Sequence, residues 1–175
     1  MPQTIALILL GIVALLAYSY FFMKKSRKRL FQRVAAFTVA EIPGFAVKFR
    51  DYLSREHPEA AAQPLADLAP LMEQLLKKPF SYLKLDPHDN DAMVFAIGSH
   101  LGERIASEHT GRWEQSDGKG PALVIGTEEA QVTMYPIEKA AGIQEFGAPG
   151  DLLAYILTCR EVADELNRRA GTTPP

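Results

Sequence analysis

Two polar side chains have types and spacing that suit acid–base chemistry. His100 and Glu103 are three residues apart in the stretch 89–109, whose apolar pattern is helical, so they share one helix face. A histidine and a carboxylate placed in this way can exchange protons with a substrate or bind a metal ion. His109 lies nine residues from His100, about 180° around an ideal helix, and points elsewhere. The hypothesis that follows from the pair is a membrane-tethered hydrolase.

The competing interpretation of these residues is structural. His100, Glu103, Arg104, Ser107 and Glu108 fit the solvated face of an amphipathic helix. A solvated face needs no special geometry, so we favour this interpretation. We expect a non-enzymatic protein and assign no catalytic residue.

A second candidate group is centred on Trp113, the only tryptophan of the chain. It stands at the start of a predicted hairpin, where a large aromatic residue belongs to the core or anchors a partner. Arg112 precedes it, and Glu103 suits an ion pair with Arg112 or with Arg104. The candidate partner-binding residues are Trp113, Glu103, Glu108 and Arg112.

The sequence contains none of the common phosphate or metal motifs, so we expect no cofactor and no metal site. There is no G-x-x-x-x-G-K-S/T or G-x-G-x-x-G loop, no C-x-x-C and no H-E-x-x-H. The acidic residues of 86–91 lack the glycine and closing glutamate of an EF-hand and suit helix capping. Cys159 is the only cysteine, which excludes a disulfide within the chain. It lies among apolar residues and is expected to be buried.

The periodicity of apolar residues predicts the α+β class, with a mostly helical domain and a three-stranded antiparallel β-meander. The predicted helices cover 30–41, 45–56, 65–78, 89–109 and 152–170. Pro43-Gly44 is expected to break the first two apart, and Asp151 to cap the last. The helix over 89–109 is expected to be central, because Gly98 and Gly102 indicate close approach of another backbone.

The remaining elements are short. The predicted strands cover 112–115, 121–126 and 131–135. A Gly-rich turn at 116–120 joins the first two into a hairpin. A helical turn at 137–141 and a loop at 142–150 are expected to follow. Residues 80–85 suit a short strand or a packed loop.

Residues 98–139 carry a recognisable order of motifs. Leu101-Gly102-Glu103 lies on the central helix, Gly111-Arg112-Trp113 opens the hairpin, Gly120-Pro121 opens the next strand, and Tyr135-Pro136-Ile137 begins the following segment. This order resembles bacterial domains of unknown function in which an L-G-E helix is followed by a G-x-W hairpin. The resemblance covers about a quarter of the chain. It implies a bacterial origin and a helix–hairpin–helix order, and it carries over no functional residue.

The first 29 residues have the composition of a membrane anchor. Ile5 to Met23 contains no charged residue and has the length of one membrane-spanning helix, about 28 Å at ~1.5 Å per residue. A basic collar follows, formed by Lys24, Lys25, Arg27, Lys28 and Arg29. The positive-inside rule then places the N-terminus outside and the rest of the chain in the cytoplasm. The lipid bilayer is the first expected partner, and the collar is either a topology signal alone or also a site for anionic headgroups.

Charge is segregated along the chain. Six of the 19 basic residues lie in 1–33, which has no acidic residue, so 34–175 holds 13 basic residues against 21 acidic ones and a net charge of −8. An acidic domain is a poor ligand for nucleic acid, whose phosphates need clustered lysine and arginine. It suits a protein partner, in particular a basic one.

These features predict a single-pass protein of the bacterial inner membrane. The expected organisation is an anchor with its collar at 1–29, one cytoplasmic domain at 30–170 and a disordered tail at 171–175. The expected function is a protein-binding module of the immunity or adaptor type. Two alternatives stay open: the hydrolase that uses His100 and Glu103, and a domain that senses a lipid or a small ligand.

Overall fold

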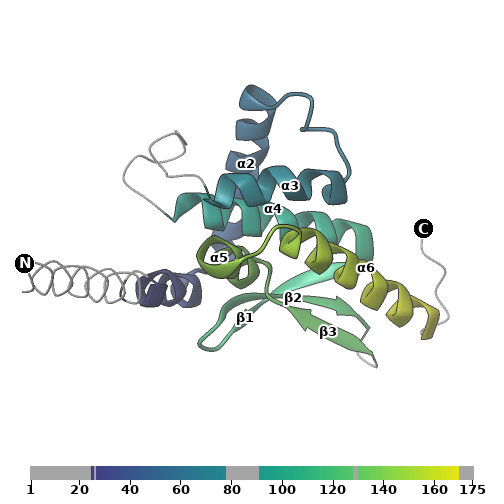
Figure 1. Cartoon of the computed structure of the whole chain (residues 1–175). Helices are drawn as coiled ribbons and strands as arrows, with labels where there is room; N and C mark the ends of the chain where they lie inside the picture. The colour runs from purple at the N-terminus through teal and green to yellow at the C-terminus, as the bar shows by residue number, and fades with distance from the viewer. Residues whose placement is uncertain (1–24, 26, 78–90, 128–129, 170–175) are drawn as a thin grey trace, which may run out of the picture.

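A computed structural model describes residue 25 and residues 27–77, 91–127 and 130–169 (Figure 1). An N-terminal helix, Arg27–Ala36, comes first. The other elements, in chain order, are η1 (Val39–Glu41), α2 (Ile42–Glu56), α3 (Leu65–Lys77), α4 (Ala92–His109), β1 (Gly111–Ser116), β2 (Gly120–Gly126), β3 (Gln131–Met134), α5 (Pro136–Phe146) and α6 (Asp151–Arg169). The predicted α+β class is confirmed, with mostly helical structure and a three-stranded antiparallel sheet.

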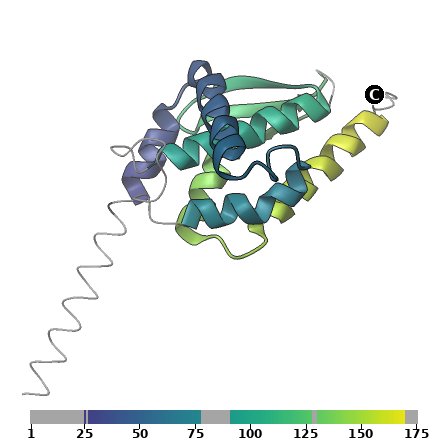
Figure 2. The same ribbon diagram turned by 90° about the horizontal axis from the view of Figure 1, so that it is seen from above.

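The helix α4 is the centre of the domain, as predicted. Figures 1 and 2 show α2 crossing one side of α4 and the sheet lying on the other side. Every residue from Ala92 to Gly102 is buried, around the whole circumference of the helix. A helix that is apolar on all sides is stable only inside a protein, so this half of α4 forms the core on which the other elements pack.

The two glycines of α4 make close contacts possible on that helix. A Cβ atom on Gly98 would lie 2.6 Å from the Cα of Ile137, so the backbone of α5 approaches here as expected. At Gly102 the close neighbour is a side chain instead, since a Cβ would lie 2.1 Å from Cζ2 of Trp113. A residue larger than glycine would therefore fit at either position only if the neighbouring element shifted.

The sheet has the order β1-β2-β3, and both pairs are antiparallel. Trp113 pairs with Leu123, which pairs in turn with Met134, so these three residues lie on one face. That face packs on the core, which includes Leu123 and Met134 and is flanked by Trp113. Arg112 alternates with Trp113 along β1 and so lies on the opposite, outer face.

The first predicted helix boundary is wrong. The helix expected over 30–41 ends at Ala36, and the chain restarts at Val39. Thr38 is extended, and its backbone N–H and its hydroxyl both donate to the Glu41 carboxylate, at 2.8 and 2.7 Å. Pro43 stands in the first turn of α2, where its missing N–H costs no helical hydrogen bond. Pro43-Gly44 therefore begins a helix instead of breaking one.

The helix α5 is longer than the predicted turn at 137–141. It continues to Phe146 through a segment expected to be a loop. Ala140, Ala141 and Ile143 are buried in the core, and their packing outweighs the ~1 kcal/mol that Gly142 costs in a helix. The sequence favoured a loop here because Gly142, Gly147, Pro149 and Gly150 fall within nine residues.

The N-terminus of α6 is capped mainly by a residue that sequence reasoning overlooked. The carboxylate of Glu73, in α3, is buried and accepts the backbone N–H groups of Gly150 at 2.9 Å and Leu152 at 2.6 Å. The predicted cap, Asp151, accepts the N–H of Ala148 at 2.7 Å. A carboxylate is stabilised at a helix N-terminus, so Glu73 joins α3 to α6 while satisfying donors that would otherwise be orphaned.

Some predictions fall on residues outside the described part: the apolar run 5–23, the stretch 80–90 and the tail 171–175. Within the part that the structure describes, no single helix is long and apolar enough to cross a membrane. The bent pair Arg27–Ala36 and Val39–Glu56 meets that test by length and composition only, with an angle of 89° between its halves.

Candidate functional site

His100 is part of the core and not of a solvated face. Only 4% of the residue is exposed, and its ring lies 5.1 Å from the ring of Phe49 in α2. Its Nε2 is buried without a hydrogen-bond partner. Burial above all, together with the nearby charges of Arg104 and Arg50, lowers the pKa of His100 from 6.5 to about 4. The prediction of a solvated His100 is therefore wrong, because α2 covers this side of α4.

Glu103, one turn further along α4, is exposed as predicted and faces a different neighbour. Its carboxylate accepts the indole N–H of Trp113 at 2.9 Å. The structure shows no hydrogen bond between Glu103 and His100, since one side chain turns to β1 and the other to α2. The pair therefore does not form the shared acid–base site that the hydrolase alternative requires.

The candidate partner-binding residues are brought together only in part. Trp113 is half-buried and contacts Glu103 and Gly102. Glu108 instead pairs with Arg160 of α6 at 3.2 Å. Arg112, on the outer face of the sheet, pairs with Glu114 at 2.8 Å. Of the four residues, only Trp113 and Glu103 are bonded to each other, whereas Glu108 and Arg112 are bonded to other side chains.

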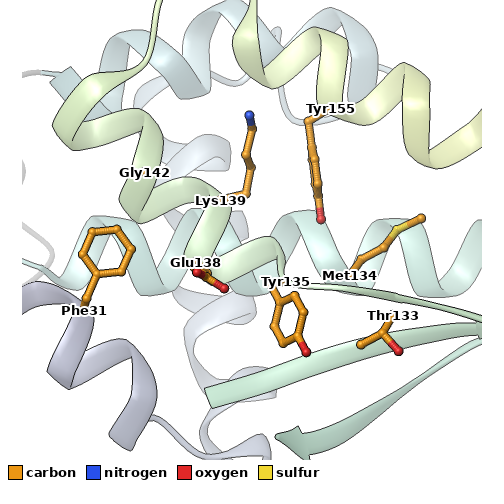
Figure 3. A pocket seen from close by; sticks show the side chains of 8 residues that line it. All are labelled: Phe31, Thr133, Met134, Tyr135, Glu138, Lys139, Gly142 and Tyr155. Carbon is orange, nitrogen blue, oxygen red and sulfur yellow. The ribbon is translucent and has the colours of Figure 1, made fainter. Parts of the chain in front are cut away.

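The structure places a groove where the sequence singled out nothing. Its volume is about 450 Å³, and it lies between the N-terminal helix, β3, α5 and α6 (Figure 3). The residues that line it are Phe31, Thr133, Met134, Tyr135, Glu138, Lys139, Gly142 and Tyr155. The groove is open to solvent, and its lining is mostly apolar, as is the lining of many ligand sites.

The charged groups of the groove lie at two different ends. Figure 3 shows the Glu138 carboxylate between the rings of Phe31 and Tyr135. The Lys139 ammonium points away from that end, and lies 5.7 Å from the centre of the Tyr155 ring. Neither charged group has a salt-bridge partner among the described residues. The acidic end therefore holds the Glu138 carboxylate beside Phe31 and Tyr135, and the Tyr135 ring already has Lys119 Nζ 4.9 Å from its centre.

The hydroxyl and thiol next to the groove are poor nucleophiles. The Tyr155 hydroxyl is buried beside the Cys159 thiol and the Tyr135 backbone without reaching hydrogen-bond geometry to either. Burial raises the pKa of Tyr155 well above its usual value of 10.0. Burial also raises the pKa of Cys159, to about 11. Cys159 is 1% exposed, so its prediction as a buried residue is confirmed.

The groove escaped sequence reasoning for identifiable reasons. Its lining comes from segments that are far apart in the chain, including Phe31 at one end and Tyr155 at the other. Glu138 and Lys139 lie in α5, which was predicted only as a short turn. The Tyr135-Pro136 step, which starts α5 at the end of β3, was the one local signal for this site.

Among the described residues, no group of three or more His, Cys, Asp or Glu side chains is placed to hold a metal ion. No protein-family model, curated protein or solved structure matches this chain. The resemblance of residues 98–139 to bacterial domains therefore stays a prediction.

Proposed function

We propose that this protein is a membrane-anchored, non-enzymatic binding module of the immunity or adaptor type, held at the cytoplasmic face of a bacterial inner membrane. The observation that carries the proposal is the groove beside the N-terminal helix. It has the size and apolar lining of a binding site, while the side chains of His100 and Cys159 are buried away from solvent. The apolar run 5–23 and the basic collar support the membrane location.

The proposed occupant is a basic side chain of a protein partner. Glu138 supplies a negative charge, and Phe31 supplies a ring that attracts a cation. The Tyr135 ring already binds a cation in this way, since Lys119 Nζ lies 4.9 Å from its centre. The net charge of −8 over residues 34–175 would steer a basic protein toward the domain from a distance. Retention at a surface raises the effective concentration of partners that share it.

Site-specific photocrosslinking in the native host tests the proposal. Benzoylphenylalanine replaces Thr133, which is exposed on β3 and lines the groove. The matched control carries the same group at Leu157, which is 45% exposed on α6 and is not part of the groove. We expect one discrete protein adduct from position 133 and none from position 157.

Charge variants then connect the adduct to Glu138. Glu138→Lys places a like charge against a basic partner and should abolish the adduct. Glu161→Lys makes the same change at an exposed position of α6 and should leave the adduct unchanged. An adduct that survives Glu138→Lys, or that forms equally from position 157, would contradict the proposed binding mode.

A small ligand is the second candidate occupant, favoured by the groove volume of about 450 Å³, which lies within the usual range for small-molecule sites. Native mass spectrometry of the detergent-purified chain distinguishes the two. A bound mass that disappears in Glu138→Lys would assign the groove to a small molecule. If mass spectrometry finds only the mass of the chain itself, and photocrosslinking at position 133 yields a protein adduct, the groove is assigned to a protein partner.

A further inference from the structure

One end of the domain combines exposed apolar residues with basic side chains. The segment Phe146–Gly150, here called the α5 tip, consists of the last residue of α5 and the four residues that follow it. Phe146 is 57% exposed, the largest exposed fraction among the big apolar residues that the structure describes. Ala148, Pro149 and Gly150 are exposed as well, and none of them carries a charge. An exposed aromatic residue on an uncharged loop is typical of a surface that contacts lipid or protein.

The N-terminal helix contacts this tip through Arg27. The Arg27 guanidinium lies 3.9 Å from the centre of the Phe146 ring, and its Nε lies 3.7 Å from the Glu145 carboxylate. Arg27 is four residues after Met23, the last residue of the apolar run. At most about 14 Å of chain separates the two, even if fully extended. The α5 tip is thus held within a short distance of the predicted membrane boundary.

A second basic residue approaches the tip from another element. Lys77, at the end of α3, donates a hydrogen bond from Nζ to the carbonyl of Gly147 at 2.5 Å. The cationic collar residues Lys25, Lys28 and Arg29 lie on or beside the N-terminal helix. Clustered lysine and arginine at a membrane surface attract anionic headgroups, at about 1 kcal/mol per residue.

The carboxylates around the tip are all engaged inside the molecule. Glu145 pairs with Arg27, Asp151 accepts the N–H of Ala148, and Glu73 accepts the N–H groups of Gly150 and Leu152. Of these three, Glu145 is neutralised by Arg27, whereas Glu73 and Asp151 bond to neutral N–H groups and keep their negative charge, with Glu73 buried. The positive charge available to an anionic bilayer at this end comes from Lys77 and from Lys25, Lys28 and Arg29 of the collar.

We propose that the α5 tip docks on the surface of an anionic phospholipid bilayer, with Phe146 at the level of the headgroups. The docking rests on the proposed anchor, and adds a second contact that holds the domain in one orientation. Aromatic rings favour this interfacial level. Phe31 lies four residues beyond Arg27, about 6 Å along the N-terminal helix, so the groove would face partners close to the membrane.

Depth-dependent fluorescence quenching of the full chain in vesicles tests the docking. Cys159→Ala removes the one native thiol, and Phe146→Cys then carries an environment-sensitive label. The control is Asp164→Cys, exposed on α6 and about 20 Å along the helix from Asp151. The vesicles contain phosphatidylcholine with or without phosphatidylglycerol, and a quencher is attached to the lipid headgroup.

In vesicles with phosphatidylglycerol, we expect the fluorescence of the label at position 146 to be quenched at least roughly twofold more than that of the label at position 164. Equal quenching at the two positions would overturn the docking. Extraction with alkaline carbonate is scored in parallel: release of the chain from the vesicles would refute the anchor, and hence the proposed location. Retention with equal quenching would refute the docking alone.

Discussion

The indole N–H of Trp113 donates a hydrogen bond to the carboxylate of Glu103 across 2.9 Å, and the same ring lies against Gly102. Pro136 also packs against Gly102, since a Cβ atom on Gly102 would lie 3.2 Å from Cγ of Pro136. Three of the four motifs in residues 98–139, those that contain Gly102, Trp113 and Pro136, therefore meet at Gly102. Their structural role is to join α4, β1 and the start of α5.

A double-mutant cycle measures the Glu103–Trp113 bond. Trp113→Phe removes the donor and Glu103→Ala the acceptor, and we expect a coupling of about 1 kcal/mol, because the carboxylate is exposed and partly screened by water. Urea unfolding of the four proteins in detergent, followed by circular dichroism, gives the free energies. Additive effects of the two changes would show that the bond contributes nothing.

Gly102→Ala should destabilise the fold, although alanine is the better helix former. The new Cβ would lie 2.1 and 2.4 Å from two atoms of the Trp113 ring, and such overpacking costs about 1–3 kcal/mol. Gly142→Ala is the matched control within α5, because nothing lies within 4 Å of its Cβ. That change should stabilise the protein by up to ~1 kcal/mol. Thermal unfolding that ranks the two variants in the opposite order would contradict the packing described for Trp113.

Glu73→Ala should loosen the contact between α3 and α6. It leaves the N–H groups of Gly150 and Leu152 without their acceptor, at a cost of about 1–3 kcal/mol. Glu73→Gln keeps one acceptor oxygen and should cost less. Glu161→Ala, an exposed change on α6, should stay within about 0.5 kcal/mol of the parent. Faster amide hydrogen exchange in the first turn of α6, seen only in the Glu73 variants, would locate the effect.

His100 should make the stability depend on pH in the acid range. The unfolded chain takes up a proton at this histidine as the pH falls below 6.5, whereas the folded protein does so only near its pKa of about 4. The free energy of unfolding should therefore fall between pH 6.5 and pH 4 and level off below, by roughly 3 kcal/mol in total. His100→Leu should remove this component and be neutral or stabilising at pH 7, because it replaces an unpartnered polar group.

The measurement for His100 is the difference between the two proteins. Chemical unfolding is repeated from pH 7 to pH 4 for the parent and for His100→Leu. Acidic side chains titrate in both proteins, so their contribution cancels in the difference. Parallel curves would mean that His100 is not buried as a neutral group.

Local sequence patterns predicted the fold class and most of the helices and strands correctly. Periodicity and Gly-rich turns found α4, the hairpin and α6, because those signals are local. The pair Gly98 and Gly102 marked α4 as the packing centre, since glycine in a helix interior needs a compensating contact. The apolar run at 5–23 and the collar carry the membrane prediction, which also depends only on local composition.

Which polar residues are available for chemistry depends instead on how the elements pack against one another. His100 and Glu103 look equivalent on a helical face, but α2 buries His100, and Glu103 accepts a hydrogen bond from Trp113. Glu73 reads as a surface glutamate in an amphipathic helix, yet it caps a helix almost 80 residues away. The groove around Glu138 joins four elements. Burial and partnership at these positions depend on contacts between distant segments, which local patterns do not encode.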